Sequence, residues 1–114
     1  MNLKKQDMNI AETILKQLGG RRFAVITGSK SFIAGKNSLS MRLAKNKSSA
    51  NYLRITLNGK DLYDMEFISI RGVKMTTKCI KNDLYNDQLQ NMFESVTGFY
   101  TTLSPRRGQE ILTF

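Results

Sequence analysis

Apolar and polar residues alternate strictly over two stretches in the middle of the chain, 38–44 and 51–58. The apolar positions are Leu39, Met41 and Leu43 in the first stretch and Leu53, Ile55 and Leu57 in the second. A period of two places every apolar side chain of a strand on one face. Each stretch therefore predicts a β-strand with one apolar and one polar face, and the polar segment 45–49 predicts the turn between them.

Three further segments have strand character. Residues 22–27 are rich in β-branched and aromatic side chains and precede a Gly/Ser/Lys-rich stretch, 28–38, which predicts a basic loop. In 62–71 the apolar positions are Tyr63, Met65 and Phe67, and they alternate with Asp64 and Glu66. Residues 73–81 follow a turn at Arg71 and Gly72, with one face formed by Val73, Met75, Thr77 and Cys79. A strand order that follows the chain then predicts an antiparallel meander of about five strands.

The connection at Asn58 and Gly59 constrains how two of these strands pair. A two-residue loop would place inward Leu53 opposite outward Asp64, which a regular strand cannot accept. A three-residue loop preserves the faces, and one such register sets Arg54 opposite Asp64 and Tyr52 opposite Glu66.

Helical spacing occurs at both ends of the chain. Residues 9–18 begin at a potential cap, Asn9, and carry Ile10, Ile14, Leu15 and Leu18 on one side before Gly19 and Gly20. Residues 83–97 carry Tyr85, Leu89, Met92, Phe93 and Val96 on one side before Gly98. Two such helices would cover the apolar face of the sheet. The sequence thus predicts an α+β fold, with a single domain over 1–103 and a flexible basic tail over 104–114.

Composition limits the chemistry available to the chain. Its 114 residues suit one domain, and it holds one cysteine and no histidine. Cys79 therefore has no disulfide partner within the chain, and metal and cofactor sites are not expected. The chain shows neither an apolar run of membrane-spanning length nor a signal-peptide core. We expect a cytoplasmic protein without membrane association.

An enzymatic role has little support in the sequence. Asp64 and Glu66, the close carboxylate pair, are expected beside Arg54 as a surface ion-pair ladder rather than as an acid and a base. Cys79 shares its parity with inward residues and is expected to be a buried small apolar side chain. Gly35 and Lys36 do not fit the spacing of a phosphate-binding loop. We therefore expect a protein that is not an enzyme.

The net charge of +9 is distributed unevenly. Residues 13–60 contain no Asp or Glu but ten Lys and Arg, whereas residues 61–114 contain seven acids and six bases. A positive field favours contact with polyanions. The candidate nucleic-acid-binding residues are Arg21, Arg22, Lys30, Lys36, Arg42, Lys45, Lys47 and Arg54. We predict non-specific binding of DNA or RNA, since no sequence-reading motif is present. Tyr52 is expected on the same outward face as Arg54. Two roles are open for its ring: stacking on a base, or packing against a side chain of the neighbouring strand.

The segments ILKQLGGRRFAVITGSKSF, NYLRITLNGKDLYDMEF and LYNDQLQNMFESVTGFYTTL resemble small uncharacterised proteins encoded by bacteriophages and other mobile elements. The likeness covers about residues 11–103. It implies a bacterial host cytoplasm as the setting but assigns no functional residue. In that setting the alternative to nucleic-acid binding is an inhibitor or accessory factor that docks on a host or element-encoded enzyme, such as an anti-defence protein.

Overall fold

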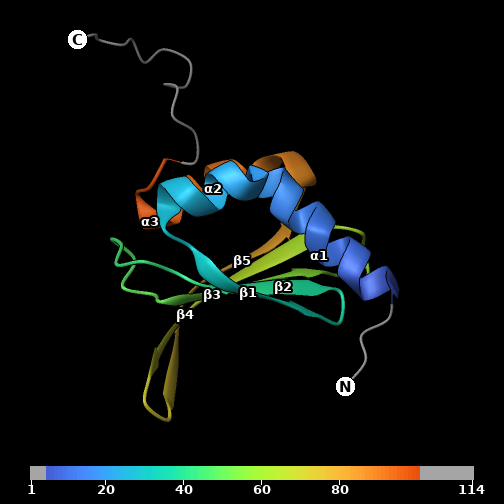
Figure 1. Cartoon of the computed structure of the whole chain (residues 1–114). Helices are drawn as coiled ribbons and strands as arrows, with labels where there is room; N and C mark the ends of the chain where they lie inside the picture. Colours follow the sequence, from blue (N-terminus) through green and yellow to red (C-terminus); the bar gives the residue numbers. More distant parts are fainter. Residues whose placement is uncertain (1–4, 101–114) are drawn as a thin grey trace, which may run out of the picture.

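A five-stranded antiparallel sheet forms one layer of the protein, and the helices form the other (Figure 1). The computed structural model describes residues 5–100. Its elements are α1 (Lys5–Leu18), α2 (Gly20–Thr27), β1 (Lys30–Gly35), β2 (Ser38–Arg42), β3 (Tyr52–Leu57), β4 (Tyr63–Arg71), β5 (Lys74–Leu84), the short 3-10 helix η1 (Asn86–Gln88) and α3 (Leu89–Thr97). The strands lie in the order β1-β2-β3-β4-β5, which confirms the predicted meander and the α+β class. The predicted tail, 104–114, lies outside the described residues.

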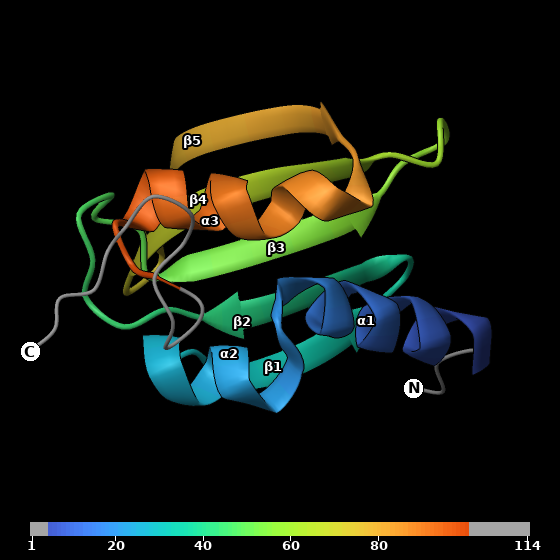
Figure 2. The ribbon, with the colours of Figure 1, turned by 90° about the horizontal axis from the view of Figure 1, so that it is seen from above.

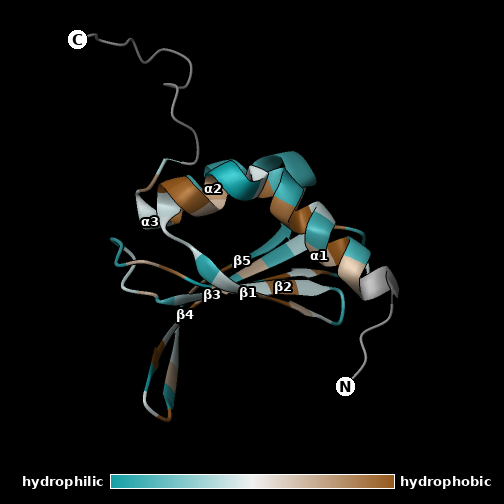
Figure 3. Cartoon of the chain, viewed as in Figure 1, coloured by the Kyte–Doolittle hydropathy of each residue, from teal (hydrophilic) through white to brown (hydrophobic). Residues whose placement is uncertain are grey.

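Helices α1, α2 and α3 cover the same face of the sheet (Figure 2). Hydrophilic and apolar positions alternate along the helices (Figure 3), and the buried core combines apolar residues of the helices with those of the strands. Five of the predicted inward residues of the central strands are fully buried: Met41, Leu53, Ile55, Met65 and Phe67. Leu39, Leu43 and Tyr63 are also buried, and Leu57 at the end of β3 is half-buried. Phe23 of α2 and Phe93 of α3 meet edge to face, with ring centroids 4.9 Å apart. The predicted inward faces of β2, β3 and β4 are therefore confirmed.

The strand predicted at 22–27 is wrong, because these residues form α2. Gly19 adopts φ 126°, a conformation that L side chains rarely adopt, and this lets the chain turn and begin a second helix at Gly20. In a helix, Phe23 and Thr27 lie one turn apart and both are buried. Burial of this face outweighs the β propensity of the segment. Helix α1 also begins before the predicted cap at Asn9.

The first strand lies instead within the predicted basic loop. Lys30–Gly35 pairs with β2 through a tight turn that contains Asn37 at φ 53°. The predicted helix at 83–97 is shorter than expected, because β5 continues to Leu84, which is buried opposite Tyr63. α3 begins only at Leu89, after η1, and ends at Gly98 as predicted.

The predicted pairing of β3 with β4 is shifted by two residues. Arg54 lies opposite Glu66 rather than Asp64, and Tyr52 lies opposite Ile68. The cause is a longer loop, which Asn58 closes by accepting hydrogen bonds from the backbone N–H groups of Lys60 and Leu62. A shift of two preserves the faces of both strands, so the core prediction was unaffected.

The predicted single face of the fifth strand is also wrong. Ile68 pairs with Thr77 but its neighbour Phe67 pairs with Cys79, so a bulge at Lys78 reverses the faces. Thr77 therefore lies on the side opposite Cys79. Cys79 is half-buried against the edge of the core, where full burial was expected.

We predict that Gly19→Ala destabilises the protein by about 1–3 kcal/mol, because alanine is strained at this φ. Its Cβ would also lie 3.2 Å from the Cβ of Phe23. Urea unfolding measures the loss. Gly20→Asn is the control. A Cβ added at Gly20 would have no atom within 4 Å, and asparagine tolerates the φ of +68° found there. Equal stability of the two variants would contradict the prediction.

Candidate nucleic-acid interface

The two ends of the sheet differ in charge. At one end, Lys30 of β1 lies opposite Arg42 of β2, the loop 43–51 follows, and β4 returns to finish at Arg71. We call this the basic end; its cations are Lys30, Arg42, Lys45, Lys47, Arg71, Lys74 and Lys78. Neither the loop 43–51 nor the segment 67–82 contains an Asp or Glu. Positive charge at this end is therefore not offset by carboxylates on the same segments.

Carboxylates gather at the opposite end of the sheet. The Asn58 side chain donates hydrogen bonds to Asp64 (3.1 Å) and Asp83 (2.9 Å), and Lys60 forms an ion pair of 3.1 Å with Asp83. Burial raises the pKa of Tyr63 beside this group, and nearby Asp61 raises it further. The protein is thus polarised along the sheet as well as along the sequence.

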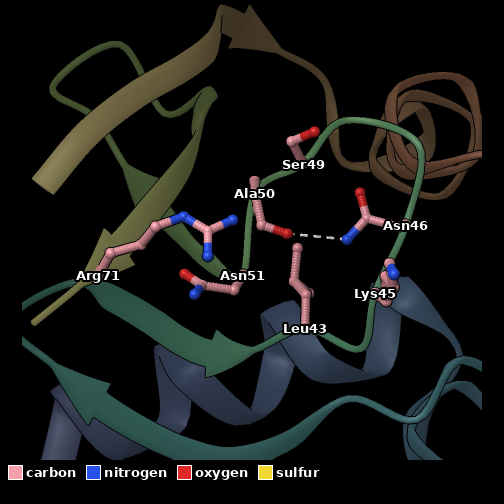
Figure 4. A pocket seen from close by; sticks show the side chains of 7 residues that line it. All are labelled: Leu43, Lys45, Asn46, Ser49, Ala50, Asn51 and Arg71. Atoms are coloured by element: carbon pink, nitrogen blue, oxygen red, sulfur yellow. Dashed lines mark hydrogen bonds between the residues drawn. The ribbon is translucent and has the colours of Figure 1, made fainter.

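A hollow of about 420 Å³ opens at the basic end (Figure 4). Its lining consists of Lys45, Asn46, Ser49, Asn51 and Arg71, with Leu43 and Ala50. Arg71 extends toward Asn51 and Ala50 from β4, whereas Lys45 and Asn46 lie across the hollow on the loop (Figure 4). The lining combines two cations with amide and hydroxyl groups and includes no carboxylate. Such a surface offers hydrogen-bond donors to an anion.

Asn46 holds the loop 43–51 in shape. Its Nδ2 donates to the carbonyls of Ala44 and Ala50, each at 2.8 Å. Its Oδ1 accepts hydrogen bonds from the backbone and hydroxyl of Ser48, and the Ser48 hydroxyl accepts one from Ala50 N. Because these side chains satisfy the loop's own backbone, the loop has a defined conformation without belonging to the sheet.

Asn51 ties this loop to β4. Its Nδ2 donates to the Ile70 carbonyl at 2.9 Å, and its Oδ1 accepts from the Ile70 N–H at 2.8 Å. Its backbone N–H also donates to the Ile68 carbonyl. The side chain therefore extends the β3–β4 ladder by one step and holds the backbone next to Arg71 against the loop that carries Lys45.

A second, smaller hollow of about 200 Å³ shares Arg71 with the first. Its other lining residues are Ser69, Lys74, Thr76 and Lys78, all from β4 and β5. This lining too has no carboxylate. Arg71 thus links the two hollows into one basic surface.

The structure brings together only part of the predicted binding set. Lys30, Arg42, Lys45 and Lys47 lie at the basic end. Lys36 lies at the opposite end, in the β1–β2 turn, where the adjacent Asn37 carbonyl accepts a hydrogen bond from Leu57. Arg21 and Arg22 are exposed on α2, in the helix layer. Arg54 lies in the middle of the sheet, 3.5 Å from Glu66.

Arg71, Lys74 and Lys78 of the basic end are not among the binding residues predicted from the sequence. These three cations belong to the near-neutral half of the chain, where the acids at 61–66 and 83–94 cancel their charge in a count over the whole half. A shorter window would have found them, because residues 67–82 hold four cations and no acid.

Metal binding and acid–base chemistry have little support among the described residues. Over 8–100, where side chains are described, no three His, Cys, Asp or Glu residues come together in a way that could hold a metal ion. The carboxylates of Asp64 and Glu66 are engaged with Asn58 and Arg54, respectively. None of the helices within 5–100 is long and apolar enough to span a bilayer.

We predict that Asn51→Ala lowers the free energy of unfolding by about 1–3 kcal/mol, because it leaves the N–H and carbonyl of Ile70 without partners. Amide exchange at Ile70 should also accelerate. Asn91→Ala, at an exposed position on α3, is the control and should change neither quantity appreciably. Unchanged exchange at Ile70 in Asn51→Ala would show that this side chain does not hold the strand end.

The arrangement is suited to binding anions through several separate cations on a preformed surface. No protein-family model, curated protein or solved structure matches this chain.

Proposed function

We propose that this protein binds nucleic acid without sequence specificity through its basic end. The observation that carries the proposal is the pair of adjoining hollows that share Arg71. Lys45, Arg71, Lys74 and Lys78 line them, together with hydroxyl and amide side chains, and no carboxylate is present.

The chemistry of this surface matches a chain of phosphates rather than one small anion. Both hollows are open, and their cations belong to a loop and to two strands. Separate cations along a surface contact successive phosphates, and each contact releases condensed counterions. Ser49, Ser69 and Thr76 add hydroxyl donors, which contact phosphate and sugar without distinguishing bases.

We predict that the triple variant Lys45→Gln, Arg71→Gln, Lys74→Gln binds generic DNA and RNA more weakly, with a log–log salt slope shallower by about 2 to 3. The measurement is a titration between about 50 and 200 mM salt, a range over which several phosphate contacts cost a hundredfold or more in affinity. The substituted side chains are exposed, so the unfolding midpoint should change little.

The control is Lys16→Gln, Arg21→Gln, Lys36→Gln, which removes the same charge from exposed positions away from the basic end. This variant should retain most of the affinity and the slope. If both triple variants lose affinity equally, net charge rather than the basic end governs binding.

A second candidate is a protein partner, with this protein as an inhibitor or accessory factor of an enzyme. The sheet face without helices, which we call the outer face, favours it. Ile33 and Ile80 are 58% and 52% exposed there. Between them in one cross-strand row lie Ser40, Arg54 and Glu66. Absence of nucleic-acid binding at about 50 mM salt would favour this candidate.

A further inference from the structure

The end of the β4–β5 hairpin leaves the body of the protein. Figure 1 shows it projecting from the sheet on the side opposite the helices. We call residues 69–77 the arm. Every residue from Arg71 to Lys78 is exposed, and Val73 at the tip is 103% exposed. Gly72 at φ 62° forms a two-residue turn with Val73, since Arg71 pairs with Lys74 on either side.

The arm has two unlike faces. The cross-strand pairs Ser69–Thr76 and Arg71–Lys74 belong to the cationic face that lines the smaller hollow. The intervening pair Ile70–Met75 belongs to the other face, where Met75 is 58% exposed. Figure 3 shows both hydrophilic and apolar segments along the arm. Cations and apolar side chains are therefore offered together on one narrow element.

The arm contributes little to the stability of the folded protein. A two-stranded hairpin beyond the sheet gains little from packing, and an isolated one is marginally stable in water. Exposing Val73 and Met75 brings no burial to the protein itself. The arm is nevertheless held at its base by the two hydrogen bonds between Asn51 and Ile70. The hairpin is thus presented in a fixed direction while its apolar tip is left without cover.

The dimensions of the arm match a groove of duplex DNA. From Ile68 and Thr77 to the tip, the strands extend roughly 13–16 Å at about 3.3 Å per residue. The major groove of B-form DNA is about 12 Å wide and about 8.5 Å deep, and it admits a two-stranded β-ribbon. The major groove of A-form RNA is too narrow and deep for side chains to enter.

We propose that the arm enters the major groove of B-form DNA. Arg71, Lys74 and Lys78 contact the phosphates, while Val73 and Met75 lie against base edges such as the thymine methyl group. The proposal rests on the proposed function and narrows it, because it names duplex DNA as the preferred partner and the arm as the element that selects it.

The test compares Val73→Asp with Val25→Asp. Both replace an exposed valine by the same acid, and Val25 is 75% exposed on α2. Binding of each full-length variant and of the wild type is measured on duplex DNA, duplex RNA and single-stranded DNA of equal length at low salt. Protection of guanine N7 from dimethyl sulfate is measured on the DNA duplex, because N7 lies in the major groove.

We expect the wild type to prefer duplex DNA and to protect guanine N7. Val73→Asp should bind the DNA duplex about tenfold or more weakly, since it brings an acid close to phosphates. Val25→Asp should remain close to the wild type. Thermal unfolding of both variants shows that the comparison concerns folded protein.

Two results would contradict the entry of the arm into the major groove while leaving the proposed function intact. One is DNA binding that the two variants weaken equally, with N7 unprotected. The other is equal binding of duplex RNA with the same sensitivity to Val73→Asp. Failure of the wild type to bind any of the three nucleic acids removes the proposed function, and the arm's role in DNA binding with it.

Discussion

The apolar face of the sheet must be kept from water, and the edge-to-face contact of Phe23 with Phe93 joins the two parts of its cover. Helix α2 brings in Phe23 and α3 brings in Phe93, although these residues are far apart in the chain. Gln90 of α3 strengthens the junction by donating a hydrogen bond of 3.1 Å to the carbonyl of Leu18, at the C-terminal end of α1. Because α1, α2 and α3 all cover one face, the other face, the strand ends and the β4–β5 hairpin are not covered by any helix within residues 5–100.

The location of the charge follows from that arrangement. In an antiparallel meander, every second connection lies at the same end of the sheet. Residues near positions 30, 42 and 71 therefore lie at one end although they are distant in the sequence. The carboxylates of Asp64 and Asp83 are held at the other end of the sheet by hydrogen bonds from Asn58. The difference in charge between the two ends of the sheet is therefore a property of the topology and not only of the composition.

Sequence reasoning succeeded where a local period records which side of an element is buried. The faces of β2, β3 and β4 were predicted correctly from alternation, and the helical spacing that ends at Gly98 was recognised. It failed at 22–27, where β-branched residues favour a strand but the turn at Gly19 and the burial of Phe23 select a helix. It also failed on the face of β5, because one bulge at Lys78 reverses the alternation.

Periodicity and composition are enough to predict the class of fold, the buried faces of the central strands and the excess of positive charge, because they are local properties of the chain. Which cations share a surface depends instead on contacts between distant segments. Arg71 and Lys45 line the same hollow because Asn51 bonds to Ile70, a contact that spans 19 residues of the chain. Loop lengths, bulges and long-range hydrogen bonds of this kind set the register and direction of strands, and no local pattern records them.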